Sequence, residues 1–156
     1  MASATEIVTA FMMALESKDF DMAASYLSDD FIFSGSTPQP LNKDGFMTTM
    51  SGLASGIPNL SYHFRDIHDI PGQQQWQEGR VEATIQMTGT QSEGFVLPPL
   101  SLPPIPQTAQ SVSLPQEHWQ FAVKGDTIVM ITTDRVPGGG ITGLLKQLGI
   151  EVPIVQ

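Results

Sequence analysis

The sequence predicts an α+β fold in which three N-terminal helices cover the concave face of a strongly curved, mainly antiparallel sheet. Apolar residues recur every three or four positions in the first third of the chain, a pattern typical of helices with one buried face. Beyond Pro58 apolar and polar residues alternate, as in strands that bury one face. Helices followed by a run of strands are typical of the α+β class.

The three helices are expected in order along the first third. Residues 5–18 carry an apolar stripe at the helical period, and residues 20–27 carry a shorter one that ends at a turn signal. Asn42 is expected to cap the third helix, because its side chain can accept a hydrogen bond from a free backbone N–H. The third helix ends before Pro58, since proline breaks helices. A short helix is also expected at the C-terminus.

The strands are expected to be antiparallel and to join through short turns. The period of two and the turn residues between segments place them over residues 31–33, 60–65, 76–90, 110–123 and 127–136. The turn Lys124–Asp126 makes the last two strands a hairpin. Between the third and fourth strands, residues 95–106 interleave prolines with apolar residues, so a regular ladder cannot form there. We interpret this segment as an extended flap packed on the body or on a partner chain.

Composition limits the possible functions. The 156 residues form a single domain over 1–156, because a chain of this length builds one core but hardly two. With 7 basic and 16 acidic side chains the net charge is −9, which argues against binding to nucleic acid or to an anionic membrane. There is no cysteine, which excludes disulfides and thiolate chemistry. No basic leader or spanning apolar run is present, so we expect a cytoplasmic protein.

Several segments in the expected order resemble the SnoaL-like polyketide cyclases and ester cyclases of the nuclear transport factor 2-like superfamily. The resemblance covers nearly the whole chain. It depends on five segments: residues 11–33, residues 57–60, residues 89–95 with the prolines that follow, the glycine turn and last strand at residues 125–129, and the terminal Gly143–Gly149 stretch. It implies a cone-shaped barrel of cystatin-like fold, a homodimer, and a pocket for a small apolar molecule. It implies no metal and no organic cofactor.

The resemblance also implies one aspartate late in the last strand as the acid/base. The family position lies about three residues before Gly143, where this chain has Gly140. The nearest acid is Asp134, which corresponds to the family aspartate if residues 137–140 are an insertion. Asp134 shares a strand face with Ile128 and Met130, and desolvation on an apolar face would raise its pKa and suit it to proton abstraction. The alternative is an exposed or ion-paired aspartate.

His118 is the second candidate catalytic residue. If the hairpin places it beside Asp134, a carboxylate–imidazole pair can share proton transfer. A single strand histidine is more often exposed or simply hydrogen-bonded. The candidate substrate-binding residues are aromatic or methionine side chains, which are also typical of a core: Trp119, Tyr26, Phe33, Phe11 and Met87.

Two other motifs carry little weight. His63, His68 and the acids near them do not converge on one strand face in the number that a zinc site needs, and an ion pair of Arg65 explains them better. Residues 138–143 fit G-x-G-x-x-G, but too few residues follow for the rest of a dinucleotide-binding unit, so we interpret them as a hinge.

Two hypotheses follow. The first is a cofactor-independent cyclase or isomerase of a small apolar carbonyl compound, with Asp134 as the acid/base. The second is a non-catalytic ligand-binding or dimerisation module of the same fold, which Gly140 at the family aspartate position favours. An epoxide hydrolase is a weaker alternative, because it needs two acids and an arginine around one water.

Overall fold

The computed structural model describes residues 3–35, 40–70, 78–97, 104–134, 136 and 139–149. Within these residues the elements follow one another in the order α1 (Ala4–Glu16), α2 (Phe20–Ser25), β1 (Leu27–Ser34), β2 (Leu41–Asn42), α3 (Lys43–Gly56), β3 (Arg65–Asp69), β4 (Glu78–Ile85), β5 (Thr88–Thr90), β6 (Ser111–Ser113), β7 (Glu117–Lys124), β8 (Thr127–Thr133) and α4 (Gly140–Gln147). The order agrees with the α+β class that the sequence predicts.

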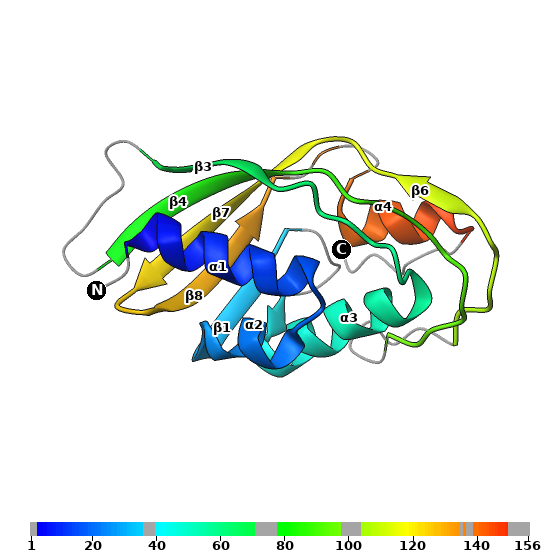
Figure 1. The fold of residues 1–156 in the computed structure, drawn as a ribbon, viewed down its shortest axis with the longest axis horizontal. Coiled ribbons are helices and arrows are strands. Elements are labelled where there is room, and N and C mark those ends of the chain that lie inside the picture. The colour runs from blue at the N-terminus through cyan, green and yellow to red at the C-terminus, as the bar shows by residue number, and fades with distance from the viewer. Residues whose placement is uncertain are drawn as a thin grey trace.

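The main sheet has six strands in the order β2-β1-β8-β7-β4-β3. Only the β1–β8 pair is parallel, and the other pairs are antiparallel. The edges β2 and β3 do not pair with each other, so the curved sheet is open rather than a closed barrel. A second, two-stranded sheet joins β5 to β6. Figure 1 shows α1 lying across the sheet, α3 beside β1, and α4 next to β6.

The helix caps follow from the sequence. Ser3 and Glu6 form a capping box at the start of α1, in which each side chain bonds the other residue's backbone N–H. The Asn42 side chain accepts a hydrogen bond of 2.8 Å from the backbone N–H of Gly45 at the start of α3, as the sequence predicts. These caps fix the two helices that cover the sheet. We call the covered face the inner face and the opposite face the outer face.

The long strands predicted over residues 76–90 and 110–123 are each divided in two. β4 ends at Ile85 and β5 begins at Thr88, and β6 ends at Ser113 before β7 begins at Glu117. Pro115 stands in the second break and cannot donate a ladder hydrogen bond, which accounts for that division. The divided strands carry the chain from the main sheet into the small one.

The ends of the proline-rich segment pack on the body. Phe95 and Ile105 exchange two backbone hydrogen bonds of 3.0 and 2.8 Å, and both side chains are buried. Leu97 is fully buried. The buried Gln91 side chain holds the base of the segment by donating to the carbonyl of Pro106 at 2.9 Å. Residues 98–103 lie outside the described residues.

The inner face carries an apolar core. The core includes six aromatic rings from α1, α3, β1 and β7 in a connected set: Phe11, Phe31, Phe33, Phe46, Trp119 and Phe121. Within the described part of the chain, no helix is both long and apolar enough to cross a membrane.

Candidate functional site

The candidate catalytic residues lie on the β7–β8 hairpin or directly after it. Along β7 the side chains alternate, so that Glu117, Trp119 and Phe121 face inwards while His118 and Gln120 face outwards. Phe11 of α1 packs edge-on against Phe121 with ring centroids 6.4 Å apart, which identifies the inner face. Neighbouring residues 117 and 118 therefore lie on opposite sides of the sheet.

Asp134 and His118 are brought together on the outer face. The His118 backbone N–H donates to Asp134 Oδ1 at 2.8 Å, and His118 Nδ1 lies 3.2 Å from Asp134 Oδ2. The backbone N–H of Asp134 in turn donates to the carbonyl of His118 at 3.1 Å. The first two contacts fix the orientation of the carboxylate relative to His118, and the third pairs the two backbones.

The expected desolvation of Asp134 is not present. Its side chain is 43% exposed and that of His118 is 45% exposed. Asp134 lies on the outer face, as exposed Met130 does. A register shift occurs between Ala122 and Val123, where β8 accommodates an extra residue. The shift turns Ile128 inwards and leaves Met130 and Asp134 outwards, so the three residues do not share a face as strict alternation predicts. Whether Asp134 is catalytic stays a prediction.

The residues predicted to bind substrate lie in or beside the core. Trp119, Phe33 and Phe11 have no exposed surface, and Met87 is 1% exposed. The Trp119 ring packs edge-on against Phe33 with centroids 5.7 Å apart. Tyr26 is partly buried at the end of α2 and packs against the same core. The structure brings four of these side chains to the interior, and their contact with a ligand stays a prediction.

Glu117 is a polar group of the interior that the sequence analysis missed. It is 2% exposed, and its Oε1 accepts a hydrogen bond of 2.6 Å from the indole N–H of Trp119. Its Oε2 lies 3.0 Å from the position that a Cβ on Gly139 would occupy, beside the start of α4. The alternation of faces along the strand could have revealed it. Glu117 precedes Trp119 by two residues and Phe121 by four, so the three side chains share one face.

Two hydroxyl groups add polarity to the same interior. The Tyr62 hydroxyl donates to Met50 Sδ at 3.6 Å, and the Tyr62 ring packs edge-on against Trp119. Burial, and secondarily the charge of Glu16, raises the pKa of the Tyr62 hydroxyl above its usual value. Thr49 of α3 is fully buried, and its hydroxyl has no hydrogen-bond partner in the described structure.

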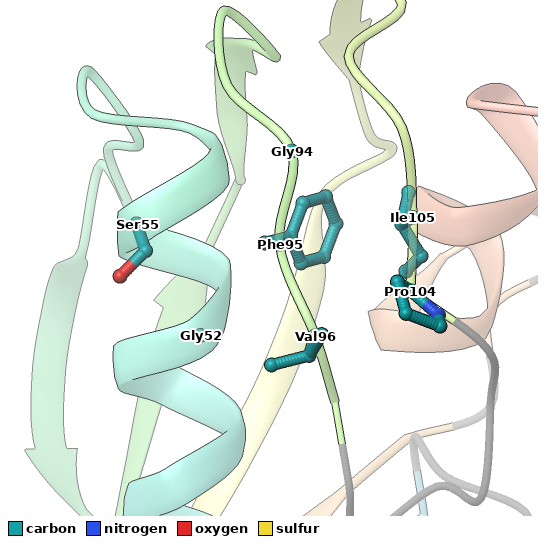
Figure 2. Close-up of a pocket in the computed structure, with 7 residues that line it drawn as sticks. All are labelled: Gly52, Ser55, Gly94, Phe95, Val96, Pro104 and Ile105. Carbon is teal, nitrogen blue, oxygen red and sulfur yellow. The ribbon is translucent and has the colours of Figure 1, made fainter.

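A separate groove lies between α3 and the proline-rich segment. Figure 2 shows residues 94–96 running between α3 and the Pro104–Ile105 segment. The groove has a volume of about 430 Å³ and an apolar lining. The backbone can approach α3 closely because Gly52 and Gly56 have no side chain; a Cβ on Gly52 would lie 2.6 Å from the carbonyl oxygen of Val96.

The segment around His63 and His68 differs from a regular strand. His63 and Asp66 have positive φ angles of 44° and 54°, so the alternation of faces is broken there. Arg65 donates to the Gln116 side chain and to the carbonyl of His63, and it forms no ion pair with the acids of the described part of the chain, contrary to the prediction. Among the described residues, no group of three or more His, Cys, Asp or Glu could hold a metal ion. Gly138 of the glycine-rich motif lies outside the described residues.

Comparison with known proteins defines the class of this fold. A family model for the SnoaL-like domain matches residues 8–131. The chain therefore belongs to the SnoaL-like domain family, as the sequence predicts. No protein of curated function matches the chain.

Solved structures of low sequence identity share the fold. AclR, a proposed hydroxylase from Streptomyces galilaeus, is 17% identical with a TM-score of 0.65, and the match covers 92% of each chain. IdmH, a proposed polyketide cyclase from Streptomyces antibioticus, is 16% identical with a TM-score of 0.66 over 96% of this chain and 100% of that one. A protein with a ketosteroid isomerase-like fold from Catenulispora acidiphila is 12% identical with a TM-score of 0.59, covering 94% and 95%.

Proposed function

We propose that this chain is a cofactor-independent cyclase or isomerase of a small apolar carbonyl compound, with a protein carboxyl group as acid/base. The observation that carries the proposal is a pair of carboxyl groups at one end of the β7–β8 hairpin. Asp134 is hydrogen-bonded to His118, and Glu117 to Trp119. A positioned carboxyl group can take a proton from a carbon next to a carbonyl and return it elsewhere, which requires no metal or cofactor.

The sequence assigns the acid/base role to Asp134, and its contacts suit that role. Both of its carboxylate oxygens accept from, or lie beside, nitrogen atoms of His118, which restricts rotation of the group. The half-exposed imidazole of His118 lies between the carboxylate and solvent, and its ring nitrogens can bind and release a proton, so it can pass the proton between the two. In this proposal Trp119, Tyr26 and Phe33 shape the apolar pocket, with Phe11 and Met87 behind them.

The reaction class can be tested without the natural substrate. The bicyclic ketone 2-tetralone has acidic C–H groups next to its carbonyl, and NMR in deuterium oxide measures their exchange. We expect the wild-type protein to accelerate this exchange above the buffer rate. An exchange rate equal to that of buffer, across several small cyclic ketones, contradicts the proposed reaction class.

The Asp134→Asn substitution tests the assignment to Asp134. Asparagine keeps the shape and the acceptor atom for the His118 N–H but cannot take up the proton. If Asp134 is the acid/base, exchange falls by about 100-fold or more while the circular dichroism spectrum is unchanged. The matched control is Glu82→Gln, which changes a carboxylate to an amide on the outer face of β4. An unchanged rate for Asp134→Asn ends that assignment.

A second candidate function is a non-catalytic ligand-binding or dimerisation module. It is favoured by the exposure of Asp134 and by an apolar pair on the outer face, where Ile32 of β1 and Met130 of β8 are register neighbours and both exposed. In this proposal the chain is a cytoplasmic homodimer. Light scattering tests the dimer, and Met130→Lys on the outer face is expected to shift it to monomer. An unchanged mass for the variant contradicts an interface at this pair.

A further inference from the structure

Glu117 is distinguished from the other acids by its surroundings. Among the residues whose burial is described, it is the only Asp or Glu in the buried class. It lies on the inner face, the face that also carries Trp119 and Phe121, whereas Asp134 lies on the outer face. A small ligand enclosed on the inner face therefore lies on the same side of the sheet as Glu117, whereas the Asp134 carboxylate lies on the other side.

The local contacts of Glu117 hold the carboxyl group in a fixed place. The Trp119 indole N–H donates to Oε1 at 2.6 Å. Oε2 faces the start of α4, whose N-cap residue Gly139 makes no side-chain capping bond. The partial positive charge of a helix N-terminus attracts an anion, so α4 also orients the group. Burial of a carboxyl group is costly, and such groups occur preferentially at functional sites.

A second, independent observation is a buried hydroxyl group on α3, on the other side of the interior from Glu117. Thr49 is fully buried and its hydroxyl has no partner, although buried polar groups are almost always hydrogen-bonded. Thr49 lies three residues after Phe46, on the face of α3 that packs on the sheet. Phe33 links the two sides, because its ring lies 4.9 Å from that of Phe46 and 5.7 Å from that of Trp119. An unsatisfied hydroxyl here points to a polar atom supplied from outside the chain.

We infer that Glu117 is the acid/base that meets the ligand inside the fold, and that the Thr49 hydroxyl hydrogen-bonds the polar end of the same ligand. This inference rests on the proposed reaction class and places its proton transfer on the inner face. The carboxylate of Glu117 takes a proton from the carbon next to the carbonyl, and the electron pair of that C–H bond moves into the enolate. In an isomerisation Glu117 then returns the proton to another carbon. In a cyclisation the enolate carbon forms a bond to a second carbonyl carbon of the same molecule, the π bond of that carbonyl breaks, and Glu117 returns the proton to the resulting alkoxide, so no proton is gained or lost.

The exchange of 2-tetralone in deuterium oxide tests this inference with variants on both sides of the interior. Glu117→Gln removes the proton acceptor but keeps an atom that can accept from Trp119, so we expect exchange to fall by about 100-fold or more. Glu117→Asp keeps the carboxyl group in a shorter side chain and is expected to retain part of the rate. Thr49→Val, which replaces the hydroxyl with a methyl group of similar size, is expected to weaken binding more than it lowers the maximal rate.

Binding is measured separately, through the fluorescence of Trp119. The chain has two tryptophans, so Trp76→Phe leaves Trp119 as the only emitter. Because Trp119 bonds Glu117, we expect 2-tetralone to change its emission in both the parent and the Glu117→Gln protein. Retained binding with lost exchange separates a catalytic role from a failure to fold, which circular dichroism also detects.

The outcomes distinguish this inference from the proposed function. Exchange that persists in Glu117→Gln and is lost in Asp134→Asn overturns the inference and leaves the proposed function standing. Absence of exchange by the wild-type protein overturns both. If Glu117→Gln unfolds, the Glu117→Asp and Glu117→Ala proteins decide. A reduced but measurable rate in folded Glu117→Asp, with loss of exchange in folded Glu117→Ala, supports the inference. An unchanged rate in folded Glu117→Ala overturns it.

Discussion

The inner and outer faces of the β7–β8 hairpin place similar chemical groups in opposite environments. On the inner face Glu117 is 2% exposed and bonds an indole N–H. On the outer face Asp134 is 43% exposed and bonds an imidazole. A step of one residue along β7, from Glu117 to His118, separates the two sites. The strand period therefore decides which carboxyl group lies on the apolar inner face.

The largest expected effect tests the packing difference between the faces. Trp119→Ala removes a fully buried ring that contacts Phe33 and Tyr62, so we expect the free energy of unfolding to fall by about 3–5 kcal/mol. The matched control is the neighbour Gln120→Ala on the outer face, with an expected change within about 0.5 kcal/mol. Urea unfolding measures both. Equal effects for the two variants would contradict the assignment of faces.

A smaller effect concerns pH and the inner face. The raised pKa of Tyr62 means that the folded protein keeps the hydroxyl proton at a pH where the unfolded chain loses it. The stability that the buried Tyr62 hydroxyl contributes is therefore fully present below about pH 10 and is lost as the pH rises above that value.

Urea unfolding of the wild-type protein and of Tyr62→Phe between pH 8 and pH 11 measures this contribution. We expect the urea midpoint of the wild-type protein to fall more steeply above pH of about 10 than that of the variant. Parallel curves would mean that the Tyr62 hydroxyl is not desolvated in the folded state. The partly buried Tyr26, present in both proteins, serves as an internal control.

Much of the fold could be predicted because local signals agree with the tertiary structure. The apolar stripes locate α1 and α3, and Asn42 caps α3 as its side chain permits. The hairpin turn at Gly125 adopts a φ of 61°, which glycine tolerates. The division of the long strands was not predicted, because periodicity within one strand does not indicate when its pairing partner changes.

The site was predicted less well, for a reason that lies in the register of β8. Strict alternation placed Ile128, Met130 and Asp134 on one apolar face, but the register shift opposite Val123 reverses the side on which Ile128 lies. A bulge leaves no clear pattern in a single sequence. The contact between Asp134 and His118 depends on the register of the hairpin, and the sequence analysis considered it as one alternative. The inward position of Glu117 could have been predicted from the alternation of faces along β7 alone.

The central claim is that the inner carboxyl group, rather than the outer one, meets the ligand. The most direct measurement is carbon-13 NMR of the side-chain carboxyl groups during titration with 2-tetralone, with resonances assigned through Glu117→Gln and Asp134→Asn. We predict that the Glu117 carboxyl resonance shifts with saturation while that of Asp134 stays in place. A saturable shift of Asp134 with an unmoved Glu117 resonance would contradict the account.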